Sequence, residues 1–482
     1  MVVSASNNIF HKALETISSL RSGERSALSG LLGSSKAFFI ASLFKKTNKT
    51  ILIITPSEDE AEGLAKDINF FLGNHAALFY PSWEILPFEA QSPHPDIIAA
   101  RINILYKLTQ ASHQMLVTTP SAILQKVLPR NALIPPSPPF EKGGHGGILR
   151  FEVGKEVNRD EVLQKLLQMG YSRISMVGER GEMRIAGGIL DIFPPSYSSP
   201  IRIEFFGDEV EAIRTFDIAT QRSKEIMHEA VILPAREIIF SQEGKELAKN
   251  KLRQRAEELE LPRDIRESIS DRIRDGLIFS GIDFLLPLFY EKLDAVFDYL
   301  TDDCLVFLDN QYEIEEAAKG FEKGVLDWKT NFEQKRQLFV RPEDLYINQD
   351  EFESALNKTA LISMETSLGK GVEFSTESNL DIRQDIATRK EEILKPLADR
   401  IKNWQSLSWA ICIVCHTSGQ AERLKELLEG YNLIADCGFK IRNSKFEIRN
   451  YHRRFNFWLP FPIPKTCYCY RGRNFWTKDK ET

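Results

Sequence analysis

Short apolar runs alternate with amphipathic stretches along the first part of the chain. The β-branched run Thr50–Thr55 is typical of a buried parallel strand, and Met115–Thr119 repeats the pattern. A Pro-Ser pair follows each run, and apolar residues at helical spacing predict helices after Pro56 and from about Pro95. Strands that alternate with helices predict an α/β domain with a parallel sheet.

A different pattern, an alternation with a period of two, occupies the middle of the chain. It predicts four strands, at Glu182–Ala186, Ile189–Phe193, Ile201–Phe206 and Val210–Phe216. The last two are separated by Gly207-Asp208, which is hairpin-turn chemistry. The Pro/Gly-rich stretch Ile134–Gly147 comes before them and reads as a linker. We therefore expect a small α+β domain inserted into the first α/β domain.

These patterns divide the chain into six segments. They are residues 1–133, the first part of the α/β domain; 134–149, a Pro/Gly-rich insert or linker; 150–234, the inserted α+β domain; 235–341, the return to the first domain plus a connecting segment; 342–437, a partial third α/β domain; and 438–482, a basic and aromatic tail. In the tail, Phe439–Asn443 recurs as Phe446–Asn450, and we expect that the tail is not native to the preceding domain.

Composition narrows the classes of function. The 482 residues contain no apolar run of about 18 that could span a membrane, and no signal peptide. Six cysteines in so long a chain do not make a disulfide framework, so we expect a cytoplasmic protein without a membrane partner. Cys412 and Cys415 have half a zinc-site spacing, but strand alternation places them on opposite faces, and we expect no metal site.

Charge is unevenly distributed. Residues 438–482 carry eleven Lys/Arg and three Asp/Glu, and the chain's net −6 with the tail's +8 leaves −14 on residues 1–437. An acidic body is a poor non-specific clamp for DNA, because affinity for the duplex depends on neutralised phosphates. The basic tail could stack on single-stranded nucleic acid, and this nucleic-acid-binding hypothesis stays open.

The strongest chemical motif is an incomplete P-loop. Its candidate residues are Gly30, Gly33, Ser34 and Lys36. A working loop needs a second glycine before the lysine and a Ser/Thr after it that holds magnesium. Here these positions are Ser35 and Ala37. No acidic pair follows an apolar strand, since Asp59-Glu60 lies in a helix and Asp208-Glu209 in a turn. We expect a relic turn, no catalytic residue, and no cofactor for this chain.

The strand Ile201–Phe206 offers a candidate surface for binding another protein. Alternation places its isoleucines and Phe205 on a core face, and it turns Arg202 and Phe206 outward. Arginine beside an aromatic residue is the composition of an interaction hot spot. The alternative is that Phe206 folds over a neighbouring strand and Arg202 makes an ordinary surface ion pair.

Several long motifs resemble those of the bacterial transcription-repair coupling factors. They are Leu78–Arg101 (LFYPSWEILPFEAQSPHPDIIAAR), Val177–Gly181 (VGERG), Gly187–Pro195 (GGILDIFPP), Pro200–Phe206, Phe216–Arg222 (FDIATQR) and Gly281–Tyr290 (GIDFLLPLFY). The resemblance runs from about residue 10 to about residue 437. It implies a UvrB-like, P-loop helicase-like α/β domain whose ATPase function has degenerated, with an inserted domain that resembles the module docking on UvrA.

The resemblance also points to site residues. In the family two arginines and a phenylalanine of the inserted module bind UvrA. The second arginine and the phenylalanine correspond to Arg202 and Phe206, whereas the first corresponds to Ala186. Arg184, two residues earlier on the same strand face, is the candidate substitute.

The resemblance therefore implies a platform that recruits UvrA in transcription-coupled nucleotide-excision repair. The family's RNA polymerase-binding module and DNA translocase do not match this sequence, so we expect a truncated chain. RNA polymerase, DNA, ATP and magnesium would belong to those modules only. The alternative function is that of a divergent P-loop ATPase or DNA-binding repair protein related to UvrB.

Overall fold

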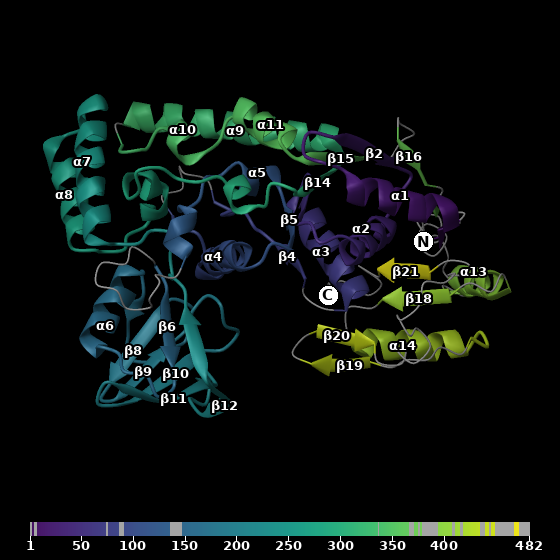
Figure 1. The fold of residues 1–482 in the computed structure, drawn as a ribbon, viewed down its shortest axis with the longest axis horizontal. Coiled ribbons are helices and arrows are strands. Elements are labelled where there is room, and N and C mark those ends of the chain that lie inside the picture. Colours follow the sequence, from purple (N-terminus) through teal and green to yellow (C-terminus); the bar gives the residue numbers. More distant parts are fainter. Residues whose placement is uncertain are drawn as a thin grey trace, which may run out of the picture.

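The computed structural model describes most of the chain (Figure 1). The described residues are 2–3, 7–73, 76–85, 91–134, 147–335, 337–365, 371–374, 376–377, 394–406, 410–414, 418–433, 439–442, 445–448 and 467–471. The predicted linker 134–149 and the residues Cys415 and Cys437 fall wholly or largely outside these ranges.

A seven-stranded parallel sheet forms the centre of the first domain. In order across the sheet its strands are β16 (Val372–Glu373), β2 (Arg25–Ser29), β15 (Ala360–Glu365), β14 (Leu305–Asp309), β3 (Ile51–Ile54), β5 (Met115–Thr118) and β4 (Ala77–Phe79). The run of apolar residues in β3 is buried on both faces, which is why its sequence does not alternate with polar residues. The parallel α/β sheet predicted from the sequence is confirmed.

Helices cover both faces of this sheet. On one face lie α1 (Asn7–Ser19), α2 (Ser34–Lys46) and α3 (Glu58–Leu72), and on the other lie α4 (Pro95–Gln110), α5 (Pro120–Ile123), α9 (Gln311–Lys335) and α11 (Gln349–Asn357). Alternate residues of each strand point to opposite faces of the sheet. In β3, Ile51 and Ile53 pack against α1, α2 and α3, whereas Leu52 and Ile54 pack on the face covered by α4, α5, α9 and α11. Each strand therefore holds two helical layers together.

Local sequence sets the ends of these helices. The Ser57 side chain accepts a hydrogen bond from the backbone N–H of Glu60, three acidic residues follow in the first turn of α3, and Gly73 ends it with a φ of 70°. A hydroxyl N-cap and acidic residues near the positive end of the helix dipole favour the start of a helix. A glycine in the left-handed conformation favours its end.

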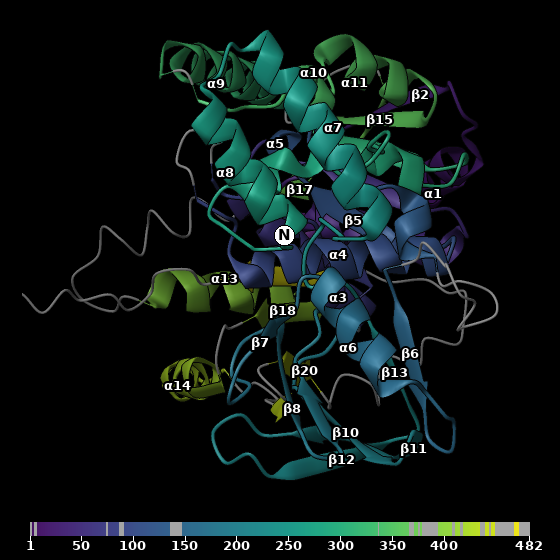
Figure 2. The ribbon, with the colours of Figure 1, turned by 90° about the vertical axis from the view of Figure 1, so that its left-hand side faces the viewer.

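The inserted region folds as a separate unit whose larger sheet is antiparallel except at one edge. Its six-stranded sheet has the order β12 (Ser223–Met227), β11 (Glu209–Phe216), β10 (Ile201–Phe206), β9 (Ile189–Ile192), β8 (Glu182–Ala186) and β7 (Ser172–Arg173). The strands β6 (Leu149–Glu152) and β13 (Glu229–Ile232) pair beside it, and α6 (Arg159–Gln168) packs on its core face. Both views show this sheet standing away from the parallel sheet (Figures 1 and 2). The predicted α+β insertion into an α/β fold is confirmed.

Buried charges tie the insertion to the first domain. The Arg101 side chain is fully buried, donates to Glu237 Oε1 at 2.8 Å and to the Pro81 carbonyl at 2.9 Å, and stacks over the Tyr80 ring at 4.6 Å. Glu237 follows β13, so this pair holds the point where the chain leaves the insertion.

A helical hairpin and short 3-10 turns follow the insertion. The hairpin is α7 (Gln242–Glu258) and α8 (Arg263–Arg274), and the turns are Ile282–Leu288 and Val296–Tyr299. Trp328 lies inside α9 and is buried against Phe332 and Phe339. The sequence predicts a connecting segment at Trp328–Arg341, the end of the 235–341 segment, but the structure places its first part in α9 and in this aromatic cluster.

The boundary of the third domain is also corrected. The sequence predicts that this domain begins at residue 342, but β15 lies between β2 and β14 of the first sheet, and β16 extends the edge beyond β2. The reason is that β15 is a largely buried apolar strand that pairs on both edges, as an interior strand of a parallel sheet does. The first domain therefore continues to at least residue 373.

The last described segments form smaller pieces. They are α13 (Lys395–Ser406), β18 (Ala410–Val414), α14 (Ser418–Glu429), β19 (Phe439–Arg442), β20 (Lys445–Ile448) and β21 (Cys467–Arg471), whereas the short helix α10 (Pro342–Leu345) comes earlier, between α9 and α11. The two copies of the short repeat pair with each other as the β19–β20 hairpin, and β21 pairs in parallel with β18. Among the described helices, none is both long and apolar enough to cross a membrane.

Candidate protein-docking site

The outer face of the antiparallel sheet carries a row of residues in register across five strands. Arg184 of β8 lies opposite Asp191 of β9, which lies opposite Arg202 of β10. Arg202 is paired in turn with Arg214 of β11, and Arg214 with Ile226 of β12. We call these five residues the β8–β12 row. Side chains in register lie about 5 Å apart at their Cβ atoms, so the row forms one continuous strip.

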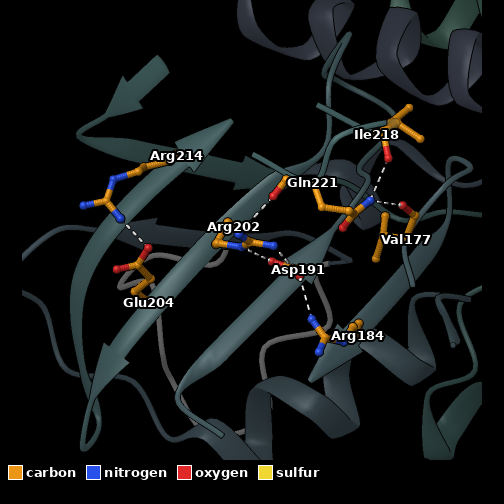
Figure 3. Close-up of polar contacts among 8 residues, drawn as sticks. All are labelled: Val177, Arg184, Asp191, Arg202, Glu204, Arg214, Ile218 and Gln221. Carbon is orange, nitrogen blue, oxygen red and sulfur yellow. Dashed lines mark hydrogen bonds and ion pairs between the residues drawn. The ribbon is translucent and has the colours of Figure 1, made fainter. Parts of the chain in front are cut away.

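Asp191 is the anchor of this row (Figure 3). Its side chain is only 1% exposed, although it lies on the outer face. Arg202 donates to both carboxylate oxygens, from Nε to Oδ1 at 2.7 Å and from Nη2 to Oδ2 at 3.0 Å, and Arg184 donates to Oδ2 at 3.3 Å. A forked guanidinium on a carboxylate is a strong, geometrically specific pair. One buried carboxylate therefore fixes the positions of two arginines.

Arg202 is further held by an aromatic ring. Its guanidinium carbon lies 4.9 Å from the centre of the Phe216 ring, and its Nη1 donates to the Gln221 carbonyl at 3.4 Å. Phe216 is buried with Val177 and Phe193 in a small core on the outer face. The hydrogen bonds to Asp191 raise the pKa of Arg202 above its ordinary value. Its side chain is 18% exposed, so part of it faces solvent while these contacts hold it in place.

A bulge precedes the two phenylalanines that end β10. The pairing of β10 with β11 shifts between Glu204 and Phe205. Phe205 then packs against the core of the unit, whereas the Phe206 side chain is 78% exposed just before the turn at Gly207, where φ is 64°. This is the alternation that the sequence predicts for β10, with Phe205 on the core face and Phe206 outward. An exposed aromatic ring offers apolar area that a partner protein can cover.

The surroundings of Phe206 and Arg202 bear on the two interpretations of the strand Ile201–Phe206. Phe206 stands in solvent and does not fold over a neighbouring strand. Arg202 makes an ion pair, but with a buried partner, unlike the solvated pair between Arg214 and Glu204. Arg184 shares that partner, while Ala186 lies in the next row, opposite Ile189.

Sequence reasoning missed three members of the β8–β12 row, namely Asp191, Arg214 and Ile226. Asp191 was detectable as the acidic residue inside the apolar strand GGILDIF, since a carboxylate there needs a cationic partner. Ile226, at 75% exposed, comes from a strand that the alternation analysis did not identify. Its sequence Ser223–Met227 is polar except at its end, so periodicity gave no signal.

The incomplete P-loop connects β2 to α2 and is filled by the chain itself. A Cβ on Gly30, where φ is 76°, would lie 1.8 Å from the Phe374 carbonyl oxygen. The Thr376 hydroxyl donates to the Gly30 carbonyl at 2.5 Å and accepts from the Leu32 N–H at 2.9 Å. A segment more than 300 residues away in sequence therefore occupies the mouth of the loop.

The lysine of this loop is also engaged. Lys36 forms an ion pair with Asp309, at the carboxyl end of β14, and both side chains are less than one-fifth exposed. Ala37 is fully buried in the core below the loop. Asp309 is a carboxylate after an apolar strand, a position that sequence reasoning overlooked, and the signal was the run Leu305–Leu308 before it. Gly33 is the N-cap of α2 and Ser34 its first residue.

Comparison with known proteins agrees with the geometry of the insertion. Residues 149–238 match the family of the UvrB interaction domain. The chain is 29% identical over 440 residues, 87% of its length, to the transcription-repair-coupling factor of Myxococcus xanthus. It is 27% identical over 414 residues to that of Escherichia coli strain K12, and 31% identical over 314 residues to that of Bacillus subtilis strain 168.

These relatives are much longer than the matched region. The alignments cover 36% of the Myxococcus xanthus protein, 34% of the Escherichia coli protein and 26% of the Bacillus subtilis protein. The chain thus spans about a third of the length of the curated relatives that it matches. The resemblance to the transcription-repair coupling factors, in their N-terminal part, is confirmed.

Proposed function

We propose that this chain, a relative of the transcription-repair-coupling factors, acts in transcription-coupled nucleotide-excision repair as a platform that docks UvrA. The observation that carries the proposal is the outer face of the region matching the UvrB interaction domain. There Phe206 is exposed beside a row of arginines held by the buried Asp191. Because the chain spans only about a third of its relatives, the activity of the whole factor is not attributed to it.

The proposed contact has the physical features of a hot spot. Phe206 supplies apolar area that loses water on contact, and its rigid ring has little conformational entropy to lose. Arg202 and Arg184 are already held by Asp191, so they pay little ordering entropy when a partner's carbonyl or carboxylate meets them. We assign the docking role to Arg202, Phe206 and Arg184 together.

The direct test is the binding of purified UvrA to the full chain by biolayer interferometry. Phe206→Ala is the primary variant, because a residue that is 78% exposed contributes little to folding. We expect it to weaken binding roughly thirtyfold, the effect of losing about 2 kcal/mol at a hot spot. Arg202→Ala should weaken binding to a similar or greater extent.

Matched controls separate docking from general charge and stability. Arg253→Ala removes an exposed arginine of α7, and Leu277→Ala removes an exposed apolar side chain beyond α8. Neither should change UvrA affinity by more than about twofold. A folded wild-type chain that does not bind UvrA, or binding that Phe206→Ala leaves intact, would refute the proposal.

For the loop at Gly30, Gly33, Ser34 and Lys36 we propose a structural role instead of ATP turnover. The support is that Asp309 neutralises Lys36 and that Ala37 offers no hydroxyl for magnesium. The rival function, a divergent ATPase, predicts magnesium-dependent ATP hydrolysis that Lys36→Ala abolishes. Such an activity in the purified chain would replace our interpretation of the loop.

A further inference from the structure

A second candidate surface lies at the opposite end of the molecule from the β8–β12 row. It is a pocket of about 400 Å³ between α9 on one side and α10 with α11 on the other. These three helices run along one edge of the molecule, far from β10–β12 in both views (Figures 1 and 2). We call it the α9–α11 pocket, and it is independent of the UvrA-docking proposal.

The floor of the pocket is apolar and continuous along α9. Ile314, Ala318 and Val325 face it from α9 at helical spacing, and Phe352 and Leu356 face it from α11. Ala318 has the smallest side chain of the stripe and lies near its middle. Leu326, at the end of the stripe, is 53% exposed. Such a stripe at the surface is typical of an interaction site.

The rim of the pocket is acidic. Within the described structure, its four carboxylates form no ion pair with lysine or arginine, and Glu315 and Glu353 accept only from neutral glutamines. The four are Glu315, Glu322, Glu343 and Glu353. The segment Pro342–Asn357, which forms one wall, contains five Asp/Glu and no Lys or Arg. The single basic residue of the lining, Arg25, is engaged by Asn357.

We propose that the α9–α11 pocket docks an amphipathic helix rich in lysine or arginine from a partner protein. The stripe from Gln311 to Leu326 covers about four helical turns, roughly 22 Å, which is the length of a recognition helix laid along a groove. A leucine or phenylalanine of the partner would enter above Ala318, and its basic residues would meet the glutamates of the rim.

The charge of the rim and the apolar floor favour a basic amphipathic helix over other ligands of the α9–α11 pocket. The acidic rim repels nucleic-acid phosphates and anionic lipid surfaces. Among the described lining residues, no buried side-chain polar atom lacks a hydrogen-bond partner, so nothing in the floor is arranged to orient a polar small molecule. A basic amphipathic helix satisfies both the apolar floor and the unpaired carboxylates.

The test uses the full chain and a fluorescein-labelled helical peptide of about 18 residues, with leucines on one face and lysines on the other. Binding is followed by fluorescence anisotropy. We expect the wild-type chain to bind, and replacement of the four rim glutamates by glutamine to raise Kd roughly tenfold or more. Ala318→Trp, which fills the middle of the pocket floor, should abolish binding of the peptide. Circular dichroism and thermal unfolding verify that both variants are folded.

The matched control replaces four exposed glutamates of α7 and α8 by glutamine. They are Glu243, Glu246, Glu257 and Glu267. This control changes net charge equally and should alter Kd by less than about twofold. Equal loss in both quadruple variants would show general charge attraction and overturn the proposal. Equal binding of a scrambled, non-amphipathic peptide would do the same, as would no binding by the wild type. A wild-type dimer that Ala318→Trp makes monomeric would identify a second copy as the occupant instead.

Discussion

Replacing Asp191 by alanine removes the carboxylate that holds Arg202 and Arg184 in place. The carboxylate is almost completely buried and accepts hydrogen bonds at 2.7, 3.0 and 3.3 Å. Its loss leaves two guanidinium groups next to each other without a counter-charge. Breaking a buried pair by removing one partner costs about 3–5 kcal/mol.

The expected value lies at the lower end of this range. The Arg184 side chain is 40% exposed and that of Arg202 is 18% exposed, so water can hydrate both arginines once the carboxylate is gone. We therefore expect the opening free energy of β9 and β10 to fall by about 3 kcal/mol, which corresponds to roughly a hundredfold faster amide exchange.

Hydrogen exchange followed by mass spectrometry is the appropriate assay. Residues 149–238 contain no tryptophan, so intrinsic tryptophan fluorescence does not report on this unit. The control is Glu204→Ala, which breaks a surface pair with Arg214 whose side chains are 29% and 34% exposed and should cost less than about 1 kcal/mol. Exchange in the Asp191 variant within threefold of wild type, or equal acceleration by Glu204→Ala, would refute the role given to Asp191.

Other predictions concern single residues. Ile226→Ala should weaken UvrA binding about tenfold without loss of stability, since the side chain is 75% exposed; unchanged affinity would place Ile226 outside the contact. Asp309→Ala leaves Lys36 without its carboxylate and should lower the free energy of unfolding by about 2 kcal/mol, measured by urea unfolding. An unchanged free energy of unfolding would mean that the pair does not stabilise the fold. Burial raises the pKa of the Cys304 thiol to about 12, so iodoacetamide at pH 8 should modify it only after denaturation, as peptide mass mapping would reveal. Hydrogen bonds from Lys224 and then Thr220 lower the pKa of Asp217 to about 2. The contribution of Asp217 to the stability of the turn should therefore be complete above pH 4 and vanish as pH falls toward 2. A carbon-13 titration that gives Asp217 its ordinary pKa of 3.8 would contradict this.

The sequence by itself determined the elements whose cause is local. Apolar runs gave β3 and β5, and the period-two alternation gave the outward positions of Arg202 and Phe206 on β10. These properties depend on residues a few positions apart, and backbone geometry translates them directly into faces. Together with the family resemblance, this local information was enough to name the insertion and its candidate docking residues.

Tertiary structure alone decided which of those residues share a partner. The burial of Asp191 between Arg184 and Arg202 needs three strands in register, which no local periodicity encodes. The ion pair of Lys36 with Asp309 joins residues 273 positions apart, and β15 lies between β2 and β14, two strands that are far from each other in the sequence. Long-range pairing is selected by the packing of the whole domain, so the sequence shows the groups that need partners without showing which partners they find.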